Sequence, residues 1–393
     1  MTGSALIDEL LADQSYYIEF NGHLTNHAKH AVVALHGIGA DPEEVRRYYD
    51  NYAKLTAYGY GLEPPRPAGK LLLTEQNWRQ YLGKRIGFAD YCDFFDAEER
   101  RLGMAELLRR YVPQLLDGWV ASFTHATIHL GWGLDAGSRW MAIEGLAYLA
   151  FSFVPCHAAR AEPPSGGDGS AVTALIEICQ AWEDDRDQLS HWVSELVAGG
   201  SADLHPELAR SGLQYRIARM LSVGHPLAYR TLGWSAGKDV AACFNELYYA
   251  VSLLYLAQPG DFVLLHLITS LHAMEQIAQR LPAEQQTEVV RSFWVGMVCI
   301  VLAEQLFPKA DKLATLHRTF DGRFDPADEW LAADWQQLAV RARLEEEEHN
   351  PKLVYVLLAL WRRAGRPSYC RAAAGQFTRT PALPPSFEQP PTE

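Results

Sequence analysis

The histidines are the residues of this chain best suited to chemistry, and the 14 of them are clustered rather than evenly spread. A buried imidazole needs a partner, and one metal ion can serve several imidazoles at once. The clusters therefore predict a metal site, for which imidazole ligands suit zinc, copper, nickel or iron. The four groups are His23, His27, His30 and His36; His125 and His129; His266 and His272; and His349 with Lys352.

The spacing within two of these groups is that of residues on one side of a helix. On a helix, His23, His27 and His30 would share one face, and so would His125 and His129, which are four residues apart. A structural role is the alternative for each histidine taken alone, because a lone histidine in an apolar helix is usually a hydrogen-bonded core residue.

Lys352 opens an otherwise apolar helix, which is an unusual position for a cation. Asn350 is a favourable N-cap and Pro351 a favourable first helical residue, so we expect Lys352 in the first turn. The helix dipole presents partial positive charge there and disfavours an ammonium group. A neutral amine, or one converted to an anion, is therefore favoured. Because His349 lies three residues earlier, both side chains could reach the same centre.

The composition is that of a soluble globular protein, with 48% hydrophobic and 21% charged residues. The net charge of −13 argues against nucleic acid as a partner, because phosphate binding needs a basic surface. The N-terminal residues lack the basic and apolar regions of a signal peptide. The most apolar stretch, 141–156, is interrupted by Glu144 and is shorter than the roughly 18 residues of a membrane helix. With six dispersed cysteines that are typical of a reduced core, we expect a cytoplasmic protein without membrane contact.

Apolar residues recur at helical spacing along most of the chain, whereas alternating runs of β-branched residues are scarce. The fold class is therefore predicted to be all-α, with one large helical domain over 1–379 and the metal site buried between helices. A connection near 158–171 is predicted to be flexible, and the Pro-rich tail 380–393 to be disordered. The predicted helices are 102–120, 173–197, 239–257, 262–280 with His266 inside it, 285–306, 330–345 and 353–363.

Three further motifs carry little weight. Residues 37–41 lack the preceding strand and the full fingerprint of a phosphate-binding loop, and are predicted to separate two helices. Residues 233–237 match the letters of a nucleophile elbow, but not its strand-to-helix context. The four glutamates at 345–348 are predicted to be the solvated face of a helix.

Five segments, in order along the chain, make it similar to the questin oxidase family. The resemblance spans nearly the whole chain and implies an enzyme of the kind first described as Baeyer–Villiger-type oxidases of fungal anthraquinone pathways. The segments are 26–30 running into 38–40, 77–84 with 94–95, 125–131, 261–266 and 349–352.

One branch of that family resembles non-haem iron dioxygenases that cleave an anthraquinone ring, with iron held by four histidines and a carboxylated lysine. The resemblance implies that Fe(2+) is held here by His27, His125, His266, His349 and the CO2-derived carbamate of Lys352, with O2 as co-substrate. The position of Lys352 agrees, because carboxylation needs a neutral amine. A carbamate is a hard anionic oxygen ligand, and beside neutral nitrogens it suits iron.

Five protein ligands leave too little room on the iron for both O2 and a chelating substrate. We therefore expect one ligand, Lys352 or His349, to be labile and so to take a catalytic role. Neighbouring residues could contact the ligands or the substrate, and the histidines among them could also be alternative ligands one helical turn away. These residues are His30, His129, His272, Asn26 and Trp132.

We interpret the chain as an iron-dependent oxygenase of secondary metabolism that acts on a small polycyclic aromatic or quinone-type substrate. The reaction would be oxidative ring cleavage or Baeyer–Villiger-type oxygen insertion, and a homodimer is compatible with this interpretation. One alternative is an NADPH-dependent Baeyer–Villiger monooxygenase, although no nicotinamide or flavin signature is present. A metal-dependent hydrolase would favour a strand-rich barrel. A non-catalytic helical binding protein would use its histidines structurally.

Overall fold

The fold is all-α, as predicted from the sequence. The computed structural model describes residues 3–156, 169–200, 204–205, 208, 212–229, 232–321 and 333–381. In these ranges the strands are β1 (Glu19–Phe20) and β2 (Leu24–Thr25), which pair antiparallel. The linker predicted near 158–171 lies outside the described residues up to residue 168, and the predicted tail lies outside them beyond residue 381.

The helices follow one another along the chain, and the stretch 55–77 between α3 and η1 is a long connection without helix or strand. The first set is α1 (Gly3–Ala12), α2 (Ala28–Gly37), α3 (Pro42–Lys54), η1 (Trp78–Tyr81), α4 (Phe88–Leu102), α5 (Met104–Leu115), η2 (Leu116–Gly118), α6 (His125–Asp135) and α7 (Arg139–Phe151). The second set is α8 (Ala171–Asp184), α9 (Arg186–Ala198), α10 (Gly212–Val223), α11 (Pro226–Tyr229), η5 (Leu232–Ser235), α12 (Val240–Ala257), α13 (Phe262–Ala278) and α14 (Ala283–Ala303). The last set is α15 (Ala310–Phe320), α16 (Trp335–Arg343), α17 (His349–Arg363) and α18 (Ser368–Ala374).

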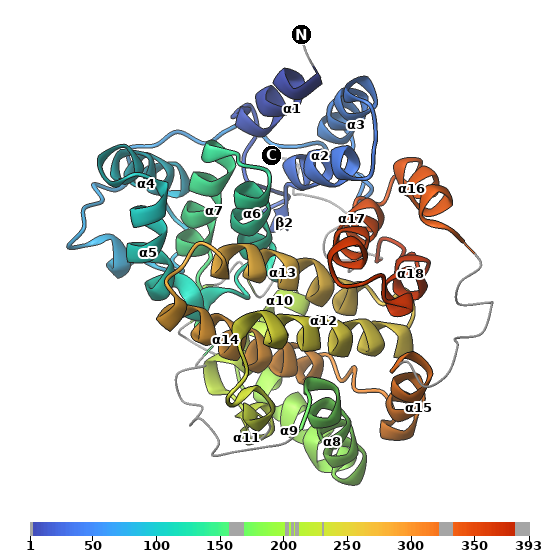
Figure 1. Cartoon of the computed structure of the whole chain (residues 1–393). Helices are drawn as coiled ribbons and strands as arrows, with labels where there is room; N and C mark the ends of the chain where they lie inside the picture. The colour runs from blue at the N-terminus through green and yellow to red at the C-terminus, as the bar shows by residue number, and fades with distance from the viewer. Residues whose placement is uncertain are drawn as a thin grey trace.

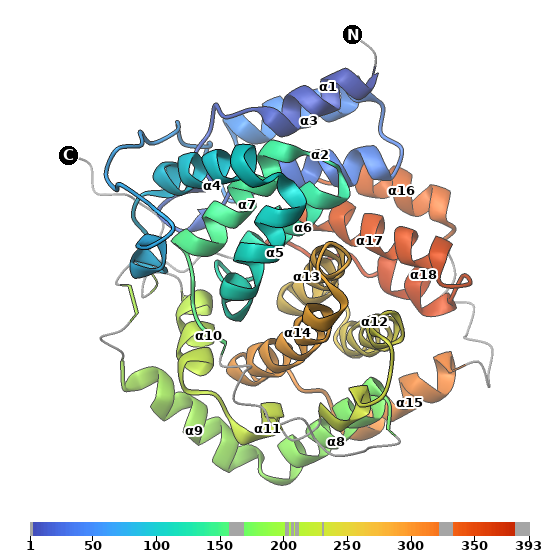
Figure 2. The same ribbon diagram turned by 60° about the vertical axis from the view of Figure 1, so that its left-hand side comes forward.

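Helix α13 runs through the middle of the molecule in both views (Figures 1 and 2). Helices α1 and α3 lie at one end, and α8, α9 and α11 lie at the opposite end. Four helices make a closed ring of contacts around the site described below, since α2 packs on α6 and α17, and α13 packs on the same two helices.

Three of the periodic stretches form continuous helices, as predicted. The predictions at 239–257, 262–280 and 285–306 correspond to α12, α13 and α14. Two predictions of one continuous helix are wrong. The stretch 173–197 is divided between α8 and α9, and 102–120 is interrupted at Gly103, where φ is +77°. Glycine accommodates that backbone conformation without the steric cost that a side chain would add.

The turn between α2 and α3 is built as predicted. Helix α2 ends at Gly37, and α3 begins at Pro42. The Asp41 carboxylate accepts a hydrogen bond from the Glu44 backbone N–H at 2.8 Å, and the Glu44 carboxylate accepts one from the Asp41 N–H at 3.0 Å. This reciprocal capping box fixes the start of α3. The motif at 233–237 begins within the 3-10 helix η5 rather than after a strand, so it is not a nucleophile elbow.

The most apolar helices form the core. Helices α12 and α14 are long and apolar enough to cross a membrane, but 67% and 78% of their most apolar windows are buried inside the protein. An apolar helix covered in this way is typical of a core helix. Residues 141–151 of the apolar stretch lie in helix α7 and are buried, and Glu144 among them pairs with Lys29. All six cysteines are free and buried.

Glycines let α6 pack closely against its two neighbours. A methyl group on Gly131 of α6 would lie 2.4 Å from Cα of Ala273 on α13, and one on Gly145 of α7 would lie 2.4 Å from Cα of Leu130 on α6. Real side chains do not fit at such distances, and packed cores yield little. These two glycines therefore set how closely α6 approaches α7 and α13.

Candidate metal centre

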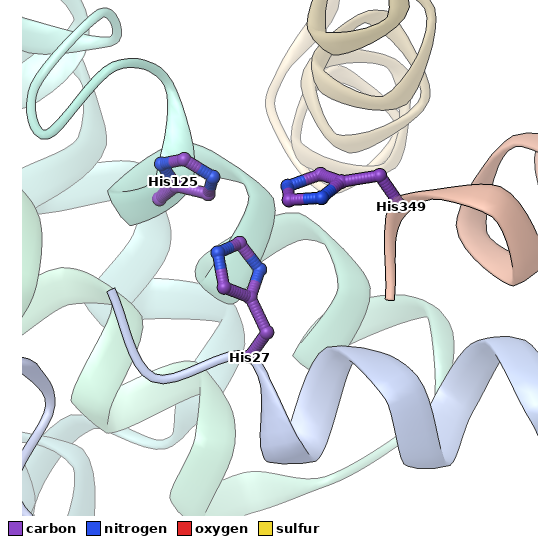
Figure 3. Close-up of side chains that lie close together, drawn as sticks. All are labelled: His27, His125 and His349. Carbon is purple, nitrogen blue, oxygen red and sulfur yellow. The ribbon is translucent and has the colours of Figure 1, made fainter. Parts of the chain in front are cut away.

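Five candidate ligands converge on one buried site. They lie on or directly beside the four helices that contact one another in a ring, α2, α6, α13 and α17. His125 is the first residue of α6, His266 lies within α13, and His349 and Lys352 lie in the first turn of α17. His27 directly precedes α2. None of the five is more than 6% exposed. Figure 3 shows His27, His125 and His349 pointing toward one another from three separate segments.

The predicted histidine face at the start of the chain is wrong. Helix α2 begins at Ala28, so His23 and His27 precede the helix, and of these three histidines only His30 lies on it. His23 lies in the turn of the hairpin that β1 and β2 form, and this hairpin keeps the backbone out of helical conformation through Thr25. The side-chain oxygen of Asn26 then accepts a hydrogen bond from the Ala28 N–H at 2.9 Å, which helps to fix the start of α2.

Asn350 is not the N-cap of α17. The helix starts at His349 with Glu348 at its N-cap position, so Asn350 is already helical. Its side-chain amide instead donates to the Thr378 carbonyl and accepts from the Thr378 N–H, both at 3.0 Å. A tertiary contact thus takes the place of the expected local cap, while Lys352 still lies in the first turn.

The nitrogens of the site are close enough to share one ion. One ring nitrogen from each of His27, His125 and His349 lies within 4.8 Å of the other two. His266 Nε2 lies 3.0 Å from His125 Nε2, and Lys352 Nζ lies 2.8 Å from His27 Nδ1. Metal–nitrogen bonds of about 2.0–2.1 Å, as for zinc, separate the ligand atoms of one ion by about 3–4 Å. The observed separations, 2.8 and 3.0 Å for two pairs and at most 4.8 Å among His27, His125 and His349, bracket that range.

Hydrogen bonding fixes which nitrogen carries the proton in two of the rings. His125 Nδ1 lies 2.7 Å from the Ser122 carbonyl, and His266 Nδ1 lies 2.7 Å from the Phe262 carbonyl. Because a carbonyl only accepts, both Nδ1 atoms donate, and both neutral rings present a lone pair at Nε2. These two lone pairs face each other at 3.0 Å. A cation bound by both would remove the repulsion, so this geometry fits a metal ion.

The glutamates before α17 belong to the centre, contrary to the predicted solvated face. Glu347 and Glu348 are only 6% and 0% exposed. Glu347 accepts a hydrogen bond from His349 Nδ1, and His349 Nε2 is then buried without a hydrogen-bond partner. Both Glu348 carboxylate oxygens are also buried without one, and Oε1 lies 3.9 Å from His27 Nε2. Glu348 is therefore a candidate ligand that sequence reasoning missed, because a run of four glutamates carries no signal of burial.

Burial keeps the histidines of the site neutral. It lowers the pKa of His27, His266 and His349 well below the usual value, and positive charge on neighbouring cationic groups adds to the effect. Burial likewise lowers the pKa of His125 to about 3, and Lys352 contributes in the same direction. Each ring therefore offers a lone pair, which is the form that binds a metal.

Burial also favours the neutral forms of the lysine and the glutamate. It lowers the pKa of Lys352, although the carboxylates of Glu348 and Glu347 oppose that shift. Burial raises the pKa of Glu348, and the charge of Glu347 raises it further. Burial therefore makes the neutral amine of Lys352 more abundant at a given pH than it would be in water.

The turn before α6 has a costly backbone conformation. The φ angles of Ser122, Phe123 and Thr124 are +48°, +52° and +68°. The left-handed region costs a non-glycine residue about 1–2 kcal/mol. The turn places the Ser122 carbonyl against His125 Nδ1. Strain of this kind persists only where the surrounding structure enforces it, and it clusters at functional sites.

A buried polar network ties this turn to the β1–β2 hairpin. Glu19 of β1 accepts hydrogen bonds from the Ser122 hydroxyl at 3.2 Å and the Tyr148 hydroxyl at 2.8 Å, and it pairs with Arg85. The Tyr148 hydroxyl also lies 2.8 Å from Thr25 Oγ1 of β2. The network therefore holds the turn that precedes α6 and the hairpin that precedes α2 in one fixed arrangement.

His30 and His129 form a second group directly beside the centre. His30 Nδ1 lies 3.4 Å from His27 Nδ1, and His30 Nε2 lies 3.0 Å from His129 Nδ1. His129 Nε2 lies 3.1 Å from Glu144, which also pairs with Lys29 at 2.5 Å. A chain from carboxylate to histidine to ligand is the arrangement that orients metal-binding imidazoles in other proteins.

His272 and Trp132 lie farther from the candidate ligands. His272 Nε2 lies 2.8 Å from Asp135, whose carboxylate also accepts a hydrogen bond from the Tyr355 hydroxyl. The Trp132 ring is 6.2 Å from the ring of His30 and 5.3 Å from that of Tyr355. The Trp132 ring thus lies between His30, which is beside the centre, and His272, which is farther from it.

Comparisons with known proteins place the chain in a family. A family model described as questin oxidase-like matches residues 24–357. The Baeyer–Villiger oxidase notM of Aspergillus sp. (strain MF297-2) is 30% identical over 135 residues, which are 34% of this chain and 28% of that protein. The Baeyer–Villiger oxidase AgnL3 of Paecilomyces divaricatus is 27% identical over 157 residues, 37% of this chain and 32% of that protein. Oxidoreductase AflY of Aspergillus parasiticus is 30% identical over 129 residues, 31% of this chain and 26% of that protein.

These alignments span less than a third of the length of each of the three relatives. The family model, by contrast, spans most of the chain and includes all five candidate ligands. The chain therefore belongs to the questin oxidase-like family, whose relatives named here are oxidoreductases.

Proposed function

We propose that this protein is an iron-dependent oxygenase that uses O2 to cleave a ring of a polycyclic aromatic or quinone-type metabolite, or to insert one oxygen atom beside a carbonyl while two electrons from a reductant such as NADPH reduce the other oxygen atom to water. The proposal depends most on one observation, the two lone pairs of His125 and His266 that face each other at 3.0 Å. Two of the relatives carry the name Baeyer–Villiger oxidase, which supports an oxidative reaction.

The donor set fits ferrous iron. His27, His125, His266 and His349 offer neutral nitrogens, and a carbamate on Lys352 would add a hard anionic oxygen, a mixture that suits iron. When bound, the iron would supply the redox chemistry of O2, which none of these side chains can provide.

Lys352 would acquire its carbamate from CO2 without help from another enzyme. The neutral amine forms an N–C bond to CO2 and releases one proton, which leaves a carboxylate on the side chain. Glu347 and Glu348 both act electrostatically on Lys352, and whichever of them is ionised at that moment would take the proton. Lys352 or His349 remains the ligand expected to leave when substrate binds.

The remaining residues of the site would orient the ligands and exclude water. His30, His129 and Glu144 hold the His27 ring in place through the contacts given above. Because all candidate ligands are buried, the site would be dry, which strengthens its electrostatic interactions and suppresses side reactions. The hydrolase alternative would need a strand-rich barrel, and the part of the chain that the structure describes has only β1 and β2 as strands.

Metal analysis of protein purified without chelators tests this proposal. We expect about one iron per chain, and we expect His266→Ala to lose it while O2 uptake with polycyclic phenols stops. His272→Ala is the matched control, because it removes another buried histidine from the same helix, outside the centre. Wild-type protein that binds no iron after anaerobic loading, or a His266→Ala variant that keeps it, would contradict the proposal.

A further inference from the structure

A cavity of about 400 Å³ opens between α3 and the segment that leads from α16 into α17. Its volume lies within the range of about 300–1,000 Å³ that is typical of small-molecule sites. Its wall includes Tyr48 and Tyr52 of α3, and Leu55 and Leu344 border it.

The cavity shares a wall with the candidate metal centre. Tyr52 lines the cavity and is only 4% exposed, and its hydroxyl accepts a hydrogen bond from the His27 backbone N–H at 3.2 Å. On the opposite side, Glu345 and Glu346 line the cavity directly before the buried glutamates of the centre. A molecule in the cavity would therefore lie one side chain away from the candidate ligands.

The apolar surface of the cavity suits a flat ring system. The Tyr48 and Tyr52 rings stack with centroids 6.2 Å apart and an interplanar angle of 15°. Leu55 and Leu344, 64% and 79% exposed, lie at its border and offer apolar surface that a bound ligand would cover. An aromatic ligand can stack on the tyrosines and cover both leucines.

The charged side chains that line the cavity favour a ligand with one acidic group. Arg343 is already engaged by the Gly39 carbonyl at 2.8 Å and by Glu44 at 3.6 Å. Within the described part of the chain, Arg47 has no ion-pair partner. Its guanidinium would bind a carboxylate in a bidentate manner, through two parallel hydrogen bonds. The carboxylate of Glu346, also unpaired there, could accept from a phenolic hydroxyl.

We propose that this cavity binds the substrate, a hydroxylated, flat, aromatic ring system that carries one acidic group, with its rings on Tyr48 and its acid on Arg47. The substrate assignment rests on the proposed oxygenase function, whereas binding in the cavity does not need the metal.

Binding to the metal-free protein tests this assignment. The probe is 4,5-dihydroxyanthraquinone-2-carboxylic acid, compared with the matching alcohol in which a hydroxymethyl group replaces the carboxyl group. We expect Arg47→Ala to weaken binding of the acid about tenfold and to leave binding of the alcohol unchanged. Leu344→Ser should weaken binding of both compounds. Lys54→Ala, on the same helix but away from the cavity lining, should change neither.

The same experiment separates this inference from the proposed function. Dissociation constants for the acid that stay unchanged in both Arg47→Ala and Leu344→Ser would overturn the cavity assignment, even if the protein binds iron and consumes O2. If the constants follow the expected pattern in a protein that binds no iron, the cavity assignment stands and the oxygenase proposal fails. Each substitution replaces an exposed side chain, and thermal melting of each variant verifies that the fold is intact.

Discussion

The Lys352 amine lies where carrying a proton is costly, because burial lowers its pKa. Its neutral form, which reacts with CO2, becomes more abundant as pH rises. We therefore predict that iron loading and activity increase between about pH 6 and pH 8.5, a window in which His125, with a pKa of about 3, is already neutral. At fixed pH, added bicarbonate should have the same effect.

Carbon-13 bicarbonate gives a direct readout of this chemistry, since a carbamate carbon has its own NMR signal. Wild-type protein should show that signal, and Lys352→Ala and Lys352→Arg should not, because an arginine stays charged. Both variants should lose iron and activity. A Lys352→Ala variant with full activity would eliminate the carbamate and the role of this lysine together.

Glu348 allows a separate test, because its carboxyl group is buried without a hydrogen-bond partner and its pKa is raised. A raised carboxyl pKa means that metal-free stability falls as pH rises from the unfolded-state value through the folded one. Glu348→Gln mimics the protonated form, so it should change metal-free stability by less than about 1 kcal/mol and should flatten this pH dependence. If Glu348 also binds iron, the variant retains less metal than wild type in a chelator competition. Equal retention would exclude it as a ligand.

The candidate site could be predicted from the sequence only in part, and the reason is visible in individual residues. Histidines are rare enough that their clusters stand out, and the first-turn position of Lys352 follows from the local sequence. Glu348 gave no comparable signal, because glutamate runs are usually solvated and only tertiary packing buries this one. Likewise, no local rule predicts that Asn350 binds Thr378, 28 residues away.

At the scale of elements, the site depends on how closely α6 approaches α13. Gly131→Ala would place a methyl group 2.4 Å from Cα of Ala273 and force the two helices apart. We predict a loss of about 1–3 kcal/mol or more in the free energy of unfolding. Iron retention should also fall, because His125 and His266 would separate. Gly375→Ala is the matched control, since its methyl group would meet nothing closer than 3.5 Å. Chemical denaturation of both variants measures the free energy of unfolding, and metal analysis measures their iron retention.

The elements themselves show where sequence periodicity is sufficient. It predicted α12, α13 and α14, which are long and mostly buried, so packing on all sides reinforces the helical pattern. It failed before α2, where pairing of β1 with β2 keeps His27 outside the helix. That hairpin is anchored by Arg85, 66 residues from Glu19, and such distant partners are invisible to a local pattern.

At the scale of the whole molecule, one consequence of burying so many imidazoles is sensitivity to acid. Burial lowers the pKa of six histidines around the centre, whereas in the unfolded chain each titrates near 6.5. Below that pH the unfolded state binds more protons than the folded state, so stability falls as pH decreases, by up to about 1.4 kcal/mol per pH unit for each histidine. The six are His27, His30, His125, His129, His266 and His349.

We therefore predict that the melting temperature of metal-free protein drops steeply from about pH 6.5 to pH 5, and that iron raises it at neutral pH because iron binds only the folded state. Chelator should remove this increase. His191→Ala should leave the pH profile unchanged, because that histidine is exposed, while His129→Gln should make the profile shallower. Scanning calorimetry across this pH range makes the comparison. A flat profile for the metal-free protein would mean that these histidines are protonated in the fold and hold no lone pairs ready for a metal.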